Sequence, residues 1–436
     1  MKPILIQGGR LIDPGQGVDE VASLLISDGK ISWRGQGEPP LPPSKYDTLN
    51  AAGMIVCPGF IDLHCHLRQP GYEDKETIAT GTLAAARGGF TTVCGMPNTN
   101  PPLDNQGAID YVKSTAASEG VVRVLPIGCI SQGRKGGHLA EMGELAGAGV
   151  IGFSDDGAPV SSSHLMRQAL AYSLAFDLPV IDHCEDSALS KDGLMNEGII
   201  STRLGLKGIP SAAEETMVAR DLALSQLTGA RLHIAHVSTE GSVDLIRRAK
   251  EKGIRVTAEV TPHHLTLTEE ALTGYDTNAK VNPPLRTAKD IGALIEGLKD
   301  GVIDAIATDH APHTEVDKLC EFGLAAFGIS GLETALGSLM KLVHSGQLTL
   351  STLIGKLTGG PAGIIGDRYG ALGSLATGAG ADITIFDPDK EWVVDTSLFA
   401  SKGKNTPLAA STLKGRVMAT ISRGKPVFKD DSVSIA

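Results

Sequence analysis

The sequence has few of the features that mark secreted, membrane-spanning or nucleic-acid-binding proteins. Its six cysteines are scattered without a Cys-x-x-Cys pair, and several lie inside apolar runs, as is typical of reduced, buried thiols. No apolar stretch approaches the ~18 residues that cross a bilayer, and the first seven residues are too few for a signal-peptide core. The formal net charge of −11 disfavours nucleic acid as a partner. We therefore expect a cytoplasmic protein with no membrane or nucleic-acid partner.

The composition is that of a large globular chain. Apolar residues make up 42% and charged residues 20% of the 436 positions, and the 53 glycines favour many tight loops. This length suggests two or three domains, or one large barrel with an addition. The negative net charge also means that an anionic ligand would need local positive charge, from an arginine or a metal ion.

Both ends of the chain read as short strands and turns. Residues 24–26 are apolar and precede Asp28-Gly29, which is a strong hairpin signal. Residues 381–388 alternate between apolar and polar side chains and stop at a proline. We therefore predict a small β-sandwich domain built from both termini, residues 1–57 and 361–436, beside a middle domain of residues 58–360.

The middle of the chain alternates short apolar runs with helix-like segments, of which 238–253 is the clearest. The eight runs are 60–63, 91–94, 121–127, 150–153, 179–181, 232–235, 254–260 and 303–307. This α/β pattern predicts a (β/α)8, TIM-like barrel. A doubly wound open sheet is the alternative. Polar residues follow almost every run, and a barrel brings all of its strand ends to one site, so we favour the barrel.

The first apolar run, residues 60–63, is followed by two histidines separated by one residue. In a strand, His64 and His66 point to the same face and Cys65 to the other. Two imidazoles side by side can bind one metal ion, although an isolated His-x-His is equally compatible with two surface histidines. Arg68 follows two residues later.

Imidazoles and carboxylates also follow the later runs. They are Asp155, Asp156, Asp182, His183, Glu185, His236, His263, His264, Asp309, His310 and His313. Such a set suits one or two divalent ions, with zinc as the first candidate, and a carboxylate can bridge two ions. Ions of this kind lower the pKa of water enough to make it a nucleophile near neutral pH, and a further carboxylate would serve as base and then acid.

Each of these side chains alone is also compatible with a satisfied polar group at a barrel mouth. We assign His138, His164 and His344 entirely to that structural class. His263 and His264 stay ambiguous because a histidine after Thr-Pro can simply brace the loop. His310 is expected to orient Asp309.

Four motifs together resemble the amidohydrolase superfamily. They are PGFIDLHCH at 58–66, MPNT at 96–99, DHAPH at 309–313 and GLET at 331–334. The sequences HLR at 66–68 and FSDDG at 153–157, with MPNT, narrow the resemblance to the bacterial class I dihydroorotases. The resemblance covers essentially the whole chain, including the flanking β domain.

This resemblance implies a metal-dependent hydrolase that reversibly cyclises N-carbamoyl-L-aspartate to (S)-dihydroorotate plus water in de novo pyrimidine (UMP) biosynthesis. By motif, His64, His66 and Asp309 would bind the first metal ion, Asp156 would bridge, and His183 and His236 would hold the second. We prefer Asp156 to Asp155 as the bridge because the following glycine matches the family pattern, and alternation lets only one of the two point inward. Asp309 would also be the catalytic proton shuttle.

The resemblance also implies the substrate contacts. Arg68 and Asn98 would hold the free carboxylate with His313, and His66 would contact the substrate as well as the metal ion. Arginine suits this role because its planar guanidinium pairs with a carboxylate through two hydrogen bonds. The backbone at Phe327 and Gly328 and the side chain of Asn282 would hold the ring amide edge.

One departure from related families is informative. Hydantoinases, allantoinases and many other dihydroorotases carry a bridging carboxylated lysine where residues 152–156 contain none. This absence disfavours a hydantoinase-like enzyme and leaves the zinc count at one or two per subunit. Residues 313–318 also differ slightly from relatives, within an expected mobile loop near 311–328.

Two alternatives remain. One is a non-catalytic or partner-dependent scaffold for aspartate transcarbamoylase, and the other is a different cyclic-amide hydrolase such as a hydantoinase or allantoinase. For the assembly, we expect a homodimer and consider a complex with aspartate transcarbamoylase possible.

Overall fold

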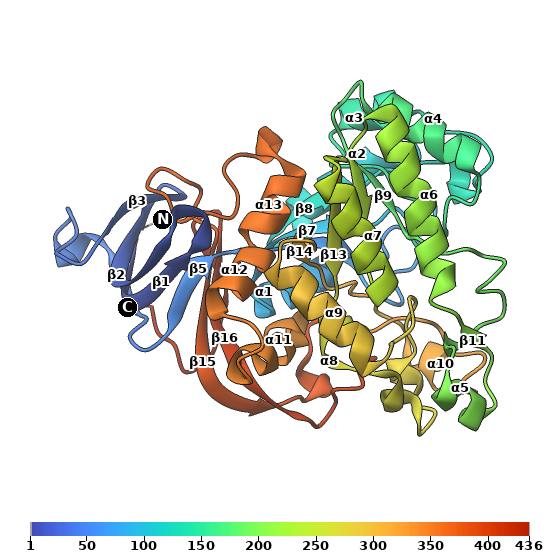
Figure 1. Ribbon diagram of the computed structural model, residues 1–436. Coiled ribbons are helices and arrows are strands. Elements are labelled where there is room, and N and C mark those ends of the chain that lie inside the picture. Colours follow the sequence, from blue (N-terminus) through green and yellow to red (C-terminus); the bar gives the residue numbers. More distant parts are fainter. Residues whose placement is uncertain (1, 436) are drawn as a thin grey trace.

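The computed structural model describes residues 2–435. Two parts lie side by side: a barrel wrapped by helices, and a twisted sheet that contains both chain ends (Figure 1). The strands of the sheet are β1 (Ile4–Asp13), β2 (Val18–Ser27), β3 (Lys30–Gly35), β4 (Asp47–Asn50), β5 (Ile55–Pro58), β15 (Ile383–Val393), β16 (Thr412–Ser422) and β17 (Lys425–Lys429). Their order is β17-β16-β15-β5-β1-β2-β3, with β4 paired to β1. N-terminal and C-terminal strands therefore meet at the β5–β15 pair.

The barrel strands follow the predicted runs closely. They are β6 (Phe60–Cys65), β7 (Phe90–Gly95), β8 (Arg123–Pro126), β9 (Val180–Asp182), β12 (Leu232–Ile234), β13 (Val256–Val260) and β14 (Ala305–Ile306). Parallel pairing joins β6-β7-β8 and, separately, β9-β12-β13-β14. The bridges of Phe153 to Gly128 and Val180 connect these two sheets, and the Cys65–His310 bridge closes the ring.

The fourth predicted run, 150–153, forms only these two isolated bridges at Phe153 and no regular strand. The reason lies in the residues that follow it. The Asp155 carboxylate accepts hydrogen bonds from the backbone N–H groups of Ile130 and Ser131, at 2.9 and 3.0 Å. These groups follow β8 and are bound by a side chain, so the ladder with the fourth strand ends early.

Helices cover the outside of the barrel. The longer ones are α1 (Ile78–Arg87), α2 (Gln106–Glu119), α4 (Ser163–Ser173), α6 (Ala212–Thr228), α7 (Glu240–Glu251), α9 (Ala288–Lys299), α11 (Ala335–His344) and α12 (Leu350–Leu357). Shorter ones are α3 (Met142–Ala148), α5 (Ile199–Leu204), α8 (Pro262–Thr266), α10 (Glu315–Lys318) and α13 (Gly359–Ile365), and a two-stranded pair joins β10 (Met195–Asn196) to β11 (Gly208–Ile209). The predicted helix in 238–253 is α7, which Thr239 caps and whose Val243 and Ile246 are buried.

Aromatic side chains join the barrel to the terminal sheet. Phe60 at the start of β6 is buried, and its ring centroid lies 5.7 Å from that of Phe90 and 6.3 Å from that of Phe386 on β15. Inside the barrel, a second cluster includes Ile61 and Leu63 together with Ile364 and Ile365 from α13. The strand that carries the paired histidines is thus fixed from both sides.

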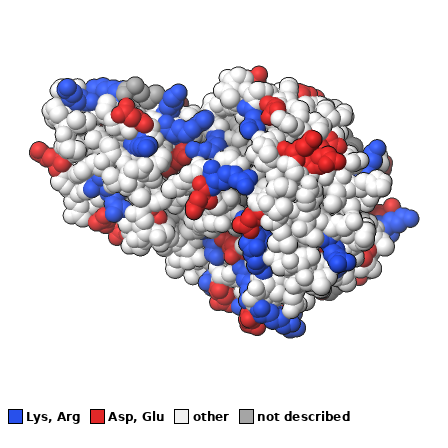
Figure 2. Space-filling model, turned by 90° about the horizontal axis from the view of Figure 1, so that it is seen from above, with Lys and Arg blue, Asp and Glu red and all other residues white. Residues whose placement is uncertain are grey.

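On the face shown in Figure 2, acidic and basic side chains are interspersed, and neither sign of charge dominates. That face carries no extended basic stripe of the kind that nucleic-acid-binding proteins present. Among residues 2–435, no helix is long and apolar enough to cross a membrane.

Candidate active site

The carboxyl ends of the barrel strands bring the predicted metal ligands together. His64 and His66 lie on or directly after β6, His183 follows β9, His236 follows β12 and Asp309 follows β14. All of these side chains are buried, and so is Asp156. The centroids of the His64 and His66 rings are 5.3 Å apart, and His64 lies 5.1 Å from His236.

Asp156 lies between two pairs of histidines. Its Oδ2 is 3.3 Å from His64 Nε2 and 3.6 Å from His66 Nε2. Its Oδ1 is 3.4 Å from His236 Nε2 and 3.7 Å from His183 Nδ1. The carboxylate therefore faces one pair with each oxygen, which is the geometry that a bridging ligand requires.

Asp155, its neighbour, points elsewhere and has a structural environment. Besides the two backbone N–H groups after β8, its carboxylate accepts a hydrogen bond from the hydroxyl of Ser131. Burial raises the pKa of Asp155 above its ordinary value despite these hydrogen bonds. The two adjacent aspartates thus face opposite environments, with Asp156 in the site.

Asp309 completes the other side of the cluster. Its Oδ1 lies 2.9 Å from His66 Nε2 and 3.5 Å from His64 Nε2. Burial would raise the pKa of Asp309, but the hydrogen bond from His66 and the charge of His64 hold it below the ordinary range. The same opposition of burial and histidine charge lowers the pKa of Asp156. Both groups are therefore ionised near neutral pH.

A glutamate that sequence reasoning missed orients His64. Glu259 on β13 accepts a hydrogen bond from His64 Nδ1 at 2.8 Å and lies 3.1 Å from His233 Nε2. Burial raises the pKa of Glu259, but these two histidines lower it to about 2. With Nδ1 engaged, Nε2 of His64 is left facing the cluster. The signal available in the sequence was a glutamate near the end of the seventh predicted run, residues 254–260.

His183 has a comparable partner. Its Nε2 lies 3.1 Å from Glu185 Oε2, and Asn282 also donates to that carboxylate. Burial raises the pKa of Glu185, while the hydrogen bond from His183 lowers it to about 2. On its other side, His183 Nδ1 lies 2.8 Å from His236 Nε2.

The cluster fits a bound metal ion by its chemistry. Two sets of residues each have their ligand atoms within 4.8 Å of one another. These sets are His64-Asp156-His236 and His64-His66-Asp309. His64 Nε2 and Asp156 Oδ1 are buried without a hydrogen-bond partner, which is costly unless another species completes them. Imidazole and carboxylate ligands suit a borderline divalent cation.

The backbone at this site is also unusual. Arg68, His236 and Asp309 have positive φ values of 62°, 32° and 45°. Residues other than glycine rarely adopt backbone conformations with positive φ, and those that do are found disproportionately at functional sites. Here the conformation aims the three side chains at the barrel mouth.

A cavity of about 220 Å³ opens beside the cluster. Its lining includes His66, Arg68, Asn98, Asp156, Gly157, His183, His236, Asn282, Asp309, Ala311, His313, Phe327 and Gly328. The structure therefore brings together every residue for which sequence motifs predicted a substrate contact, whereas His64 lies just behind the lining.

Arg68 supplies the positive charge of this cavity. Its Nε donates to Pro312 O at 3.2 Å, and its Nη2 lies 3.3 Å from His313 Nε2. Among residues 2–435, no carboxylate lies within 4.0 Å of its guanidinium, so none of these residues is an acidic partner for its charge. Burial and the charge of Arg68 lower the pKa of His313 to about 3, so that imidazole is neutral.

Other histidines lie outside the ligand set. His264 lies 2.8 Å from Thr261 Oγ1 and 2.9 Å from Pro283 O, so it braces its loop. His310 accepts a hydrogen bond from Gly331 N at Nδ1 and lies 3.4 Å from Glu76, which orients the segment next to Asp309.

The predicted mobile loop contains α10, and two buried lysines contact its backbone. Lys280 donates to the carbonyls of Phe322 and Ala325, both at 2.7 Å. Lys318 donates to Thr277 O at 2.9 Å and to Ala326 O at 2.6 Å. Within this structure the loop is therefore tied to the wall of the cavity.

A closed (β/α)8 barrel with histidines and aspartates at its strand ends, flanked by a sheet from both termini, defines an amidohydrolase-like metal-dependent hydrolase. Comparison with known proteins gives a narrower assignment. A family model described as "Dihydro-orotase-like" matches residues 53–242. The chain is 54% identical over 429 residues to a dihydroorotase of Thermoanaerobacter sp. (strain X514), covering 98% of each. It is 54% identical over 428 residues to one of Pelotomaculum thermopropionicum, covering 98% of this chain and 99% of the relative.

The chain therefore belongs to the dihydroorotase family of cyclic amide hydrolases, as the sequence motifs predicted. Among solved structures, it is similar to an L-hydantoinase (dihydropyrimidinase) from Arthrobacter aurescens, with a TM-score of 0.89 and 27% identity over 100% of this chain and 98% of the other. A dihydropyrimidinase from Brevibacillus agri has a TM-score of 0.86 at 23% identity, covering 99% and 96%. These likenesses confirm the predicted fold class, a barrel with a β-sandwich from both termini.

Proposed function

We propose that the chain reversibly converts N-carbamoyl-L-aspartate to (S)-dihydroorotate and water, in de novo pyrimidine synthesis. The observation that carries this proposal is Arg68, which lies in the same cavity as the histidine–aspartate cluster and to which no described residue is ion-paired. A carboxylate of the substrate would supply that partner. The full-length similarity to curated dihydroorotases supports the same reaction.

We further propose zinc as the cofactor, as one or two ions per subunit. His64, His66 and Asp309 would hold one ion, and His183 and His236 the other, with Asp156 shared between them. When bound, such ions polarise a carbonyl oxygen and lower the pKa of water. The support is the donor chemistry of the cluster and its unpartnered buried atoms.

Asp309 has the role of proton carrier in this proposal. In ring opening, its carboxylate accepts a proton from the attacking water and returns it to the ring nitrogen as the C–N bond breaks. In ring closure, it takes the proton from the carbamoyl nitrogen and delivers it to the departing hydroxyl. The lowered pKa of Asp309 supports a base that is already ionised.

The substrate is held at two edges. Arg68, Asn98 and His313 would bind the free carboxylate, and Asn98 is fixed by the 2.9 Å contact between its Oδ1 and His66 Nδ1. Asn282 and the backbone at Phe327 and Gly328 would hold the ring amide. The carbonyl of Gly328 already accepts one hydrogen bond, and its second lone pair is the group we assign to the ring N–H.

Arg68 also argues against a hydantoinase-like reaction, even though solved hydantoinases share the fold. A neutral hydantoin would leave the guanidinium without a counter-charge in the cavity. Residues 152–156 contain no lysine that could form the carboxylated bridge. The complete set of ligand positions, in turn, argues against a non-catalytic scaffold.

For the assembly, we propose a homodimer, with a complex with aspartate transcarbamoylase as the second state to test. Exposed apolar side chains in and after α10, within the loop that also contributes His313, Phe327 and Gly328 to the cavity, support a protein partner there. Val316, Leu319 and Leu324 are 82%, 75% and 78% exposed. Light scattering of the purified chain, alone and with the transcarbamoylase, measures both states.

Metal analysis combined with assays in both directions tests the reaction itself. The chain as purified, and again after chelation and zinc return, should convert dihydroorotate and carbamoyl aspartate and leave hydantoin unchanged. Turnover only with added transcarbamoylase would establish the partner-dependent form. Failure on both substrates under all conditions, with zinc bound, would refute the proposal.

A further inference from the structure

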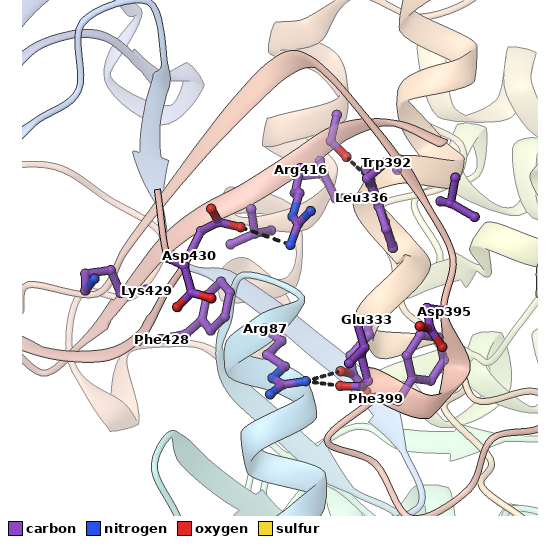
Figure 3. A pocket seen from close by; sticks show the side chains of 16 residues that line it. Arg87, Glu333, Leu336, Trp392, Asp395, Phe399, Arg416, Phe428, Lys429 and Asp430 are labelled. Carbon is purple, nitrogen blue, oxygen red and sulfur yellow. Dashed lines mark hydrogen bonds and ion pairs between the residues drawn. The ribbon is translucent and has the colours of Figure 1, made fainter. Parts of the chain in front are cut away.

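Part of the C-terminal region leaves the terminal sheet and crosses to the barrel mouth. We call residues 399–406 the crossing segment. Its start borders a cavity of about 350 Å³ between the barrel helices and strands β15 and β16, where Arg87 and Glu333 face each other beside Phe399 (Figure 3). Glu333 accepts hydrogen bonds from Ala400 N and Ser401 N, at 2.9 and 3.2 Å. These bonds fix the direction in which the segment continues.

At the end of this segment, the buried Asn405 side chain binds two parts of the substrate cavity at once. Its Nδ2 donates to Ala311 O and Gly328 O, both at 3.0 Å. Its Oδ1 accepts from His313 N at 2.9 Å and from Ser330 Oγ at 3.0 Å. These four contacts use both protons of the amide nitrogen and both lone pairs of the amide oxygen.

Gly403, in the same crossing segment, lies in close contact with Pro312. A Cβ placed at this glycine would lie 2.4 Å from Cβ and 2.7 Å from Cα of Pro312. Its carbonyl oxygen lies 2.8 Å from Ser330 Oγ, so the single hydroxyl proton of Ser330 is shared between this carbonyl and Asn405 Oδ1. The crossing segment therefore packs its backbone directly against the stretch between Ala311 and His313.

We propose that Asn405 is a positioning residue for substrate binding: it sets the distance between the two cavity walls at Ala311–His313 and at Gly328. It does not line the cavity, so it acts through the backbone groups that it holds. This inference rests on the proposed function because those walls are the assigned contacts of the substrate. Without the amide, no side chain of residue 405 would link the backbone of His313 to the carbonyl of Gly328, so the distance between these two walls would no longer be fixed by it.

Two substitutions at this position separate positioning from packing. Asn405→Asp keeps the size and both accepted hydrogen bonds, but it places an oxygen against the carbonyls of Ala311 and Gly328. Asn405→Ala removes all four bonds. If donation to the carbonyls matters, both variants should raise KM for dihydroorotate and carbamoyl aspartate by about tenfold, with kcat within about threefold. If the side chain only fills space, the aspartate variant should behave as the parent does.

Gly403→Ala would push the added Cβ against Pro312 and so displace the Ala311–His313 wall, which should also raise KM. Gly37→Ala is the matched control because no atom lies within 4 Å of its added Cβ. Metal content should stay unchanged in all four variants. Hydrogen exchange of the peptide spanning residues 309–330, measured by mass spectrometry on the zinc-loaded protein, should accelerate in both Asn405 variants and not in the control.

Unchanged KM and unchanged exchange in Asn405→Asp would overturn the positioning role, and so would a loss of kcat at constant KM. The parent chain and the Gly37→Ala control are assayed on the same two substrates. Their turnover shows independently whether the proposed function holds. Inactivity of these two proteins would refute the reaction, whereas the exchange measurement would still decide whether Asn405 orders the wall.

Discussion

At the scale of single residues, two adjacent aspartates show how position decides chemistry. Asp156 faces four histidines, whereas Asp155 accepts hydrogen bonds from the backbone after β8. Asp156→Asn should therefore release most of the bound metal and lower kcat by at least about 100-fold, with little change in the unfolding of the metal-free protein. Metal analysis and chemical denaturation after chelation measure the two effects.

Asp155→Asn is the isosteric counterpart of that change. It should cost about 1–3 kcal/mol of unfolding free energy, because an amide cannot accept all the hydrogen bonds of the carboxylate. Metal content should stay near that of the parent. The reverse pattern, with metal lost from the Asp155 variant and stability lost from the Asp156 variant, would exchange the two assignments.

Asp309→Asn tests the proton carrier. The amide keeps the shape of the side chain but cannot accept the proton of water, so kcat should fall by about 10²–10⁴ in both directions. The fold and most of the bound metal should remain, as measured by circular dichroism and metal analysis. Near-normal turnover in this variant would remove Asp309 from that role.

Arg68→Met tests the carboxylate contact. Methionine retains an apolar stem of similar length and removes the charge, so KM should rise for both dihydroorotate and carbamoyl aspartate by at least about tenfold. Steady-state kinetics in both directions measures the change. Saturation at parental concentrations would place the substrate carboxylate elsewhere in the cavity.

The residues that the sequence predicted share a common property. His64, His66, Arg68 and Asp309 stand in short motifs whose spacing and family resemblance carry their meaning. Glu259 and Asn405 stand in no such motif. Their roles arise from contacts across 195 residues to His64 and across 77 to Gly328, which only the tertiary structure reveals.

At the scale of elements, β6 is the strand on which the site depends. Phe60 begins it and packs against Phe90 on β7 and Phe386 on β15. Phe60→Ala should lower the unfolding free energy by about 3–5 kcal/mol, because it leaves a cavity where barrel and sheet meet. Chemical denaturation measures the loss. The exposed Val21→Ala on β2 is the control, and a similar loss in both would contradict this role.

The fourth barrel strand shows where sequence periodicity fails. Its apolar run at 150–153 matches the others, yet pairing stops at Phe153. Hydrogen bonds from the backbone after β8 go to the Asp155 side chain, and no periodicity of apolar residues encodes that exchange. The eight-run pattern nevertheless predicted the barrel, because one bridging residue suffices to keep the ring closed.

At the scale of the whole molecule, the sequence suggested a division into residues 1–57 with 361–436 and residues 58–360, and this division stays a prediction. The structure shows why the parts should not fold separately. One core cluster contains Ile55 and Phe386 from the terminal sheet together with Phe60 and Phe90 from the barrel. The helix α13 spans residue 361, and Ile364 lies in the barrel's inner cluster.

The isolated fragment 58–360 should therefore aggregate or unfold without a cooperative transition, because it would expose Phe60 and Phe90 and lack Asn405. Size-exclusion chromatography and thermal unfolding by circular dichroism measure this outcome. A full-length chain cleaved within the exposed residues 36–38 is the control for a chain break as such, and it should remain folded and active. A monodisperse fragment with a cooperative transition would establish the barrel as an independent domain and limit the crossing segment to a role in substrate binding.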